Sequence, residues 1–584
     1  MNDVWNLDTI YAGFQDPAFE ADLAAGTQKI AQLTALTGTL EQADPLDALR
    51  QCISLQEDIS MLAQKLGMYA SLRQFADSRD AEAQSQMGRL MGIFSATAAP
   101  EAAFQEWAAS LPDLMELVES DDLLRQYRFL FSKIKASSRY LLGSRGEEIM
   151  AKMELSGGNA WADLHTALTS TVPVSYRGTT INLPAVRNLA FDPDPQVRKD
   201  AFEAEIACYD AIKAPVAFAL NSIKLETLSD CQLRGYDSPL ARTLKEADMS
   251  RETLDAMLEA MEEYLPHFWR YLKAKAKALG HEKGLPWYDL AAPLGSSSTR
   301  FTAEDTRNYL VEHFASFDPE LSGLVARAFD EEWIDFYPRS GKCGGAFCEA
   351  VQCREESRIL TNFDGTFSDV ITLAHELGHA FHNHCVFPHR PLNRDYSMPV
   401  AETASIFNEC IINSCAMEKA AGREEQLALL ESSLHDTTQI ICDIYSRFRF
   451  ESMVFQHRQE QFMNADTLCT LMLDAQKLAY GDGLDHSCLH PYMWINKSHY
   501  YGPTFYNFPY AFGGLFARGL YAQYLEEGQA FVPKYKKLLF TTPVATAEDT
   551  AKVAGIDLTD KNFWRAALDT VVAQIDQFCR LVEE

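Results

Sequence analysis

Positive charge is scarce in this chain, and the shortage limits the ligands that it can bind. Its 584 residues include 52 lysines and arginines against 82 aspartates and glutamates, which gives a net charge of −30. Binding to nucleic acid requires a basic surface that neutralises phosphates, and no basic stripe in the sequence offsets this acidity. We therefore expect no nucleic-acid partner, although charge alone does not identify a substrate.

Long apolar runs are also missing. No uninterrupted stretch approaches the roughly 20 residues that cross a bilayer, so we expect no membrane partner. The first residues, Met1 to Asp8, lack both the basic and the apolar region of a secretory signal. The 13 cysteines are scattered, odd in number and without a C-x-x-C pair, which argues against a disulfide framework and a structural zinc ribbon. Together these features predict a cytoplasmic protein with free thiols.

Amphipathic helical patterns, in contrast, are abundant. Between about residues 15 and 170, apolar side chains recur every three or four positions, which predicts long helices packed against one another. Residues 171–183 are rich in β-branched side chains around Arg177-Gly178 and predict a small hairpin. We place a boundary near residue 185, which gives an N-terminal helical region over 1–185 and a catalytic region over 186–584.

One short string carries the main chemical signal. His375, Glu376 and His379 form H-E-x-x-H within a predicted helix, Ile371–Phe381, which Ser368 is expected to cap. Four residues advance a helix by about one turn, so both imidazoles leave one face and can converge on a zinc ion. Glu376 can then take a proton from a water at the metal. The alternative is a buried helix with two hydrogen-bonded histidines.

A catalytic zinc site needs a third protein ligand and one open position. Cys385 stands where the longer three-histidine motif has its last histidine, so that pattern fails. Glu402, among apolar and small residues after His379, is the predicted third ligand. Glu409 lies two helical turns further on the same face and can accept a hydrogen bond from a ligating histidine. For both glutamates the alternative is an ordinary solvated carboxylate.

The sequence before the motif predicts a small sheet beside the metal helix. Residues 341–348 and 357–363 are short strand-like runs bounded by glycine and charge. An exposed strand edge can bind an extended peptide and align its carbonyl with the metal. Gly344, Gly345 and Ala346 are the predicted substrate strand, because glycine permits close backbone approach. A purely structural hairpin is the alternative.

These motifs resemble those of the thimet oligopeptidase-like zinc peptidases, and within them the oligoendopeptidase F branch. The matching segments are 375–382, 401–409, the region around His499, and the opening segment 5–11. The resemblance implies a mainly α, two-lobed helical body with a deep substrate channel and a small β-sheet beside the zinc helix. It also implies that His375, His379 and Glu402 hold one catalytic Zn²⁺ and that Glu376 is the general base.

The region around His499 is rich in aromatic residues. In the family that the chain resembles, a histidine and tyrosines on a closing loop face the substrate, and His499, Tyr506 and Tyr510 match them best. Hydrogen-bond donors at these positions can stabilise the oxyanion formed during amide hydrolysis. Gly502-Pro503 and Gly513-Gly514 are expected to let this loop hinge. Without the resemblance, core packing would explain the aromatic cluster.

The expected function is therefore a zinc-dependent endopeptidase that hydrolyses internal bonds of short, unfolded oligopeptides with a metal-activated water and Glu376 as base. An exopeptidase of the same architecture and a zinc-supported peptide-binding protein without turnover are the alternatives. The intact Glu376 favours turnover, because binding alone needs no base. Loading with cobalt or manganese stays open, as do cleavage preference and oligomeric state.

Overall fold

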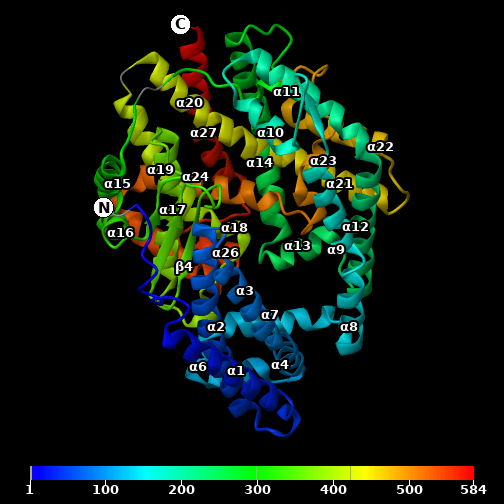
Figure 1. Ribbon diagram of the computed structural model, residues 1–584, viewed down its shortest axis with the longest axis vertical. Helices are drawn as coiled ribbons and strands as arrows, with labels where there is room; N and C mark the ends of the chain where they lie inside the picture. Colours follow the sequence, from blue (N-terminus) through cyan, green and yellow to red (C-terminus); the bar gives the residue numbers. More distant parts are fainter. Residues whose placement is uncertain (1–2, 297–298, 421, 584) are drawn as a thin grey trace.

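The computed structural model describes residues 3–296, 299–420 and 422–583. Helices account for most of these residues, and the strands form two small sheets (Figure 1). The mainly α fold expected from the sequence is confirmed.

The helices of residues 17–137 occupy one end of the molecule, the lower end in Figure 1, where they are drawn mostly in blue. Several of them begin at an aspartate whose side chain accepts a backbone N–H of the first turn, among them Asp16, Asp44 and Asp80. The first nine helices are α1 (Pro17–Thr37), α2 (Pro45–Ala76), α3 (Ala81–Phe94), α4 (Ala98–Ser110), α5 (Leu114–Ser120), α6 (Asp122–Gln126), α7 (Arg128–Ser137), α8 (Gly143–Glu154) and α9 (Gly158–Thr171).

A small hairpin follows these helices, as predicted. Strands β1 (Val174–Tyr176) and β2 (Thr179–Ile181) pair antiparallel, and Gly178 in the turn has φ +82°. The buried side chains of Val174 and Val186 belong to one hydrophobic cluster. The division of the chain near residue 185 stays a prediction, and this cluster contains residues from both sides of it.

The rest of the chain builds a larger helical body around the second sheet. The helices before that sheet are α10 (Leu183–Asn188), α11 (Pro195–Cys208), α12 (Lys213–Arg234), α13 (Pro239–Glu246), α14 (Arg251–Ala278), α15 (Ala303–Phe317) and α16 (Pro319–Asp330). The helices after it are α17 (Phe367–Val386), α18 (Met398–Ala401), α19 (Thr403–Lys419), α20 (Arg423–Thr438), α21 (Ile444–Arg458), α22 (Ala465–Tyr480), α23 (Met493–Asn496), α24 (Phe508–Glu527), α25 (Val532–Thr541), α26 (Ala547–Lys552) and α27 (Lys561–Glu583). Helix α19 packs against both α17 and α24.

The second sheet lies beside α17, as predicted. Its strands β3 (Ile334–Asp335), β4 (Phe347–Val351) and β5 (Glu356–Leu360) are arranged in the order β3-β5-β4, so β4 is an edge strand. Gly344 and Gly345 precede β4 instead of belonging to it. Gly345 has φ +80°, a left-handed conformation that a regular strand cannot contain.

The first residues of the chain bind to this sheet. The side chain of Arg358 on β5 is buried, and its guanidinium donates hydrogen bonds to the carbonyl oxygen of Asn6 (3.1 Å) and to Thr9 Oγ1 (2.8 Å). The rings of Trp5 and of Phe347 on β4 lie 6.3 Å apart. The N-terminal segment therefore supports the same sheet that borders α17.

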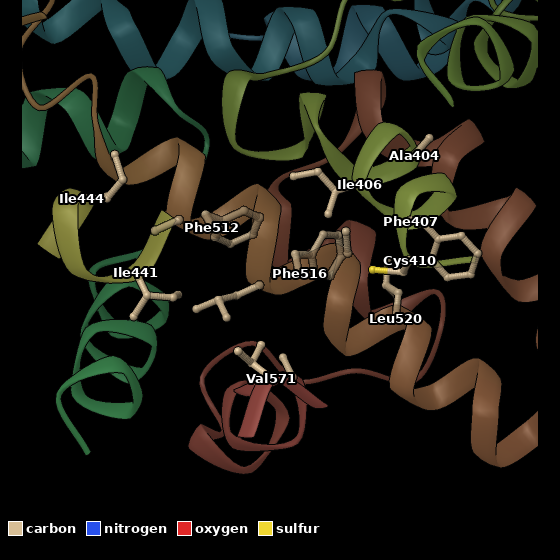
Figure 2. Packing of buried hydrophobic residues seen from close by; sticks show 14 of the residues in the cluster. Ala404, Ile406, Phe407, Cys410, Ile441, Ile444, Phe512, Phe516, Leu520 and Val571 are labelled. Atoms are coloured by element: carbon tan, nitrogen blue, oxygen red, sulfur yellow. The ribbon is translucent and has the colours of Figure 1, made fainter. Parts of the chain in front are cut away.

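A hydrophobic core fixes the orientation of α19. Figure 2 shows Phe407 and Cys410 of α19 packed with Phe516 and Leu520 of α24, and Val571 of α27 beside them. All five side chains are buried. Burial of a side chain such as Phe or Leu stabilises a fold by about 1.5–3 kcal/mol, so rotating α19 about its axis would be costly. This packing leaves the face that carries positions 402 and 409 directed away from the core and towards α17.

Candidate metal centre

Helix α17 carries the H-E-x-x-H string and begins with a capping box. Asp369 N donates to Thr366 Oγ1 (3.2 Å), and Thr366 N donates to Asp369 Oδ2 (2.9 Å). The expectation that Ser368 caps this helix was wrong, because Ser368 lies within the first turn. The capping box fixes the start of the helix two turns before His375.

His375, His379 and Glu402 bring three potential metal ligands together. The Nε2 atoms of the two histidines lie 3.2 Å apart, and Glu402 Oε2 lies 3.3 Å from His375 Nε2 and 3.5 Å from His379 Nε2. Ligands bound tetrahedrally at about 2.0–2.1 Å are separated by about 3.3–3.4 Å, so this donor set fits a zinc ion with one position open. Within the described ranges, no other group of three or more His, Cys, Asp or Glu side chains converges in this way.

Hydrogen bonds from α19 place the Glu402 carboxylate. Glu402 is the residue immediately before α19, and Ser405 Oγ donates a 2.7 Å hydrogen bond to its Oε2 atom. Asn408 Nδ2 donates to the carbonyl oxygen of Ala374 (3.1 Å), which ties α19 to α17. Ser405 and Asn408 were not predicted from the sequence. Ser405 could have been, because a serine three residues after Glu402, at the start of a helix, can form a local hydrogen bond with it.

Two glycines allow the elements of the site to approach closely. A Cβ atom at Gly378 would lie 2.5 Å from Ala404 O and 2.5 Å from Ser405 Cα, so α17 and α19 touch backbone to backbone. A Cβ atom at Gly513 would lie 2.9 Å from Glu402 Cβ. Both separations are shorter than an ordinary contact between carbon atoms, about 3.5 Å. Gly513 is thus a buried packing position within α24 and not part of a loop hinge, which corrects that expectation.

Glu409 forms the hydrogen bond expected from the sequence. His375 Nδ1 lies 2.6 Å from Glu409 Oε1, an arrangement that places the N–H on Nδ1 and directs the Nε2 lone pair towards the other two donors. Burial alone lowers the pKa of His375, but the Glu409 hydrogen bond and charge outweigh it and raise that pKa to about 9. Burial lowers the pKa of His379, which keeps this imidazole neutral and able to bind a metal.

Glu376 is suited to proton transfer. Its side chain is only 5% exposed, and burial raises its pKa to about 7, while the His375 charge opposes the shift and the Glu402 and Glu409 charges add to it. A carboxylate with a pKa near neutrality can accept a proton and release it again at little cost. The site therefore combines three converging ligands with an adjacent acid-base group.

Comparison with protein families identifies the group to which this architecture belongs. The model described as peptidase family M3 matches residues 188–570, which is more than half of the chain. The chain belongs to peptidase family M3. A second model, described as Oligopeptidase F, matches residues 98–172. This M3 chain is therefore a peptidase, and its resemblance to the oligoendopeptidase F branch is confirmed.

Characterised relatives match the M3 peptidase over nearly its whole length. Oligopeptidase PepF of Bacillus subtilis is 23% identical over 99% of this chain and 87% of the relative. Group B oligopeptidase PepB of Streptococcus agalactiae is 26% identical over 96% of this chain and 94% of the relative.

Solved structures share the fold of the M3 peptidase. A putative peptidase from Chlamydophila abortus superposes with a TM-score of 0.89, at 20% identity, over 99% of this chain and 98% of that one. Oligoendopeptidase-F from Enterococcus faecium gives a TM-score of 0.72, at 18% identity, over 97% of this chain and 99% of that one.

Two cavities meet at the metal centre of the M3 peptidase. The first, about 470 Å³, lies along β4 and is lined by Glu349 and Asp395; we call it the β4 cavity. The second, about 640 Å³, lies along α20 and is lined by Asp436; we call it the α20 cavity. Ala346, His375 and Glu376 line both cavities, so the site is open in two directions.

The structure brings His499, Tyr506 and Tyr510 together as one aromatic cluster. The His499 ring lies 5.7 Å from that of Tyr506 and 6.0 Å from that of Tyr510, and the two tyrosine rings lie 5.9 Å apart. Burial raises the pKa of Tyr510 to about 12, with contributions from Tyr506 and then from the charge of Glu402. Among the described residues, no hydrogen bond joins this cluster to His375, His379 or Glu402.

The remaining histidines near the motif have structural partners. His382 is fully buried, its Nε2 atom lies 2.8 Å from Thr542 Oγ1, and its ring stacks on Tyr396 at 3.9 Å. His486 and His490 lie between helices, and their Nε2 atoms face Gly481 O and Glu205 Oε1, respectively. They form no second cluster with the metal-centre residues.

Proposed function

We propose that this M3 peptidase is a zinc-dependent endopeptidase that hydrolyses internal bonds of short, unfolded oligopeptides. The observation that carries the proposal is the convergence of three donors at 3.2–3.5 Å beside the buried Glu376. Membership of the family supports peptide bonds as the substrate. The two cavities support internal cleavage, because a bound peptide can extend in both directions from Glu376.

The proposed mechanism assigns one task to each residue of the centre. His375, His379 and Glu402 hold the zinc ion, which when bound polarises the scissile carbonyl and lowers the pKa of a water. Glu376 accepts a proton from the attacking water and passes it to the leaving amine. Glu409 holds His375 in the tautomer whose Nε2 atom can bind the metal.

The aromatic cluster and the free strand edge are proposed to hold the substrate. His499, Tyr506 and Tyr510 donate hydrogen bonds to the oxyanion as it forms; the raised pKa of Tyr510 keeps its hydroxyl protonated near neutral pH. Ala346 borders both cavities directly before the edge strand β4. Together with Gly344 and Gly345 it is proposed to bind the backbone of an extended peptide.

Two further proposals concern the whole chain. All 13 cysteines are free thiols, which favours a reducing compartment, and we propose that the enzyme acts in the cytoplasm. The N-terminal region 1–185 and the catalytic region 186–584 are kept as a proposed division, which limited proteolysis can test.

The test of the proposed function is cleavage of a peptide blocked at both ends. An endopeptidase cuts such a peptide internally, and product masses locate the bond, whereas an exopeptidase of the same architecture needs a free end. A chelator should abolish cleavage, and stoichiometric zinc should restore it. Peptide binding without any product at any zinc level would contradict the proposal and favour a binding protein.

A further inference from the structure

An arginine lies in an otherwise apolar part of α24. Arg518 follows the buried residues Phe516 and Ala517 and is itself only half-buried. Its Nη2 atom donates a 2.8 Å hydrogen bond to Thr437 Oγ1, while its Nε atom is buried and has no hydrogen-bond partner. A guanidinium has five N–H donors, so most of the capacity of Arg518 is unused.

Arg518 also lacks a counter-ion. Among the residues that the structure describes, no carboxylate oxygen lies within 4.0 Å of its guanidinium. Other buried arginines of this chain are paired: Arg198 with Asp289 at 2.7 Å, and Arg358 with Glu356 at 3.1 Å. Removing a charge from water is costly unless a partner compensates it, so an unpaired arginine inside a cavity indicates a missing ligand.

The cavity that contains Arg518 is the α20 cavity, which it shares with His375 and Glu376. Two carboxylates also line this cavity, but neither pairs with Arg518. Glu409 is hydrogen-bonded to His375 Nδ1, and Asp436 forms no ion pair with Arg518 within 4.0 Å, although the Arg518 charge opposes the rise in the pKa of Asp436 that burial causes. The α20 cavity therefore offers a positive group on one side of the reactive centre.

The β4 cavity differs in the pairing of its charges. Glu349 and Asp395 line it without forming an ion pair within the described residues, and its arginine, Arg394, is paired with Glu355 at 3.5 Å. A peptide that spans both cavities would meet carboxylates without a counter-ion along β4 and an arginine without a counter-ion along α20. This difference suits a chain whose carboxylate-bearing part lies in the α20 cavity.

We propose that Arg518 binds a carboxylate of the substrate peptide in the α20 cavity and thereby selects among oligopeptides. This inference rests on the proposed function, because it concerns the substrate of the same centre. Guanidinium and carboxylate groups pair through two parallel hydrogen bonds, which gives geometric selectivity as well as strength. A peptide can supply the group from its C-terminus or from an Asp or Glu side chain.

The experiment compares kcat/KM for matched peptides with the zinc-loaded enzyme. The two peptides of the first pair differ only at the C-terminus, which is a free acid in one and an amide in the other. The two peptides of the second pair both end in an amide and differ only in one residue beyond the cleaved bond, which is Glu in one and Gln in the other. A charge-assisted hydrogen bond in the substrate complex corresponds to about 10- to 100-fold in this ratio. We expect the wild-type enzyme to show such a preference in one pair, and R518Q to bring the ratio close to one.

Controls keep the test independent of folding and of overall charge. The ratio for two peptides with one enzyme sample does not depend on the folded fraction, and R518K should keep part of the preference because it retains the charge. R449Q removes an exposed arginine of α21 outside the cavity and should leave the ratio unchanged.

The outcomes are distinct. A preference for the acid over the amide identifies the C-terminus as the bound group, and a preference for Glu over Gln identifies a side chain. Wild-type ratios near one in both pairs, or an undiminished preference in R518Q, would overturn the role of Arg518 while leaving peptidase activity intact. Absence of cleavage by the wild-type enzyme would overturn the proposed function, and this inference with it.

Discussion

Replacement of Gly513 by alanine should weaken the metal site although it replaces none of the ligands. The new Cβ atom would lie 2.9 Å from Glu402 Cβ and 3.3 Å from Pro399 O, so Glu402 or α24 has to move by about 0.5 Å or more to restore ordinary contact. Metal-ligand distances tolerate only about 0.2 Å. We therefore expect zinc affinity to fall about 10- to 100-fold, which corresponds to about 1.4–2.8 kcal/mol.

The assay is zinc binding measured by competition with a chelator of known affinity, together with thermal unfolding with and without zinc. Gly514→Ala is the matched control, since its Cβ atom would lie 2.8 Å from the γ2 methyl of Ile440 and does not meet Glu402. Both variants gain the same helix propensity, about 1 kcal/mol, so the difference between them reports the contact with Glu402. Equal zinc affinity for Gly513→Ala and Gly514→Ala would refute the reasoning.

Two other substitutions test the remaining roles. The pKa of His375 is about 9 in the metal-free enzyme, so at pH 7.5 this imidazole is protonated and must lose its proton to bind zinc. Calorimetry of zinc binding in buffers of different ionisation enthalpy should therefore detect the release of about one proton. E409Q removes the cause of the raised pKa and should release fewer. Tyr510→Phe should lower kcat about 100-fold with little change in KM, because it removes a hydroxyl proposed to donate to the oxyanion; an unchanged kcat in steady-state assays would contradict this role.

Local signals in the sequence predicted which side chains of the candidate centre lie close together. The four-residue spacing of His375 and His379 and the seven-residue spacing of Glu402 and Glu409 follow directly from helix geometry, and the four side chains do converge. The small hairpin and the sheet beside α17 were equally visible in the pattern of β-branched residues and glycines. Each of these features depends on residues close to one another in sequence.

Features that depend on contacts between distant segments could not be predicted. The local sequence predicts a hinge at Gly513, but contact with Glu402, more than 100 positions earlier, makes it a packing residue. Arg518 is recognisable in the sequence as a charged residue within an apolar helix, but only the structure shows that it lines a cavity together with His375. The division near residue 185 stays a prediction; Val174 and Trp494, from either side of it, belong to one hydrophobic cluster, a contact that local patterns in the sequence do not reveal.

The central claim is that Glu376 transfers the proton during hydrolysis. The direct test is Glu376→Gln, assayed for zinc content and for turnover of a quenched oligopeptide. Gln is nearly isosteric and leaves the three ligands in place, so zinc should stay bound while kcat falls about 10²- to 10⁴-fold. Zinc-loaded Glu376→Gln with undiminished turnover would contradict the account.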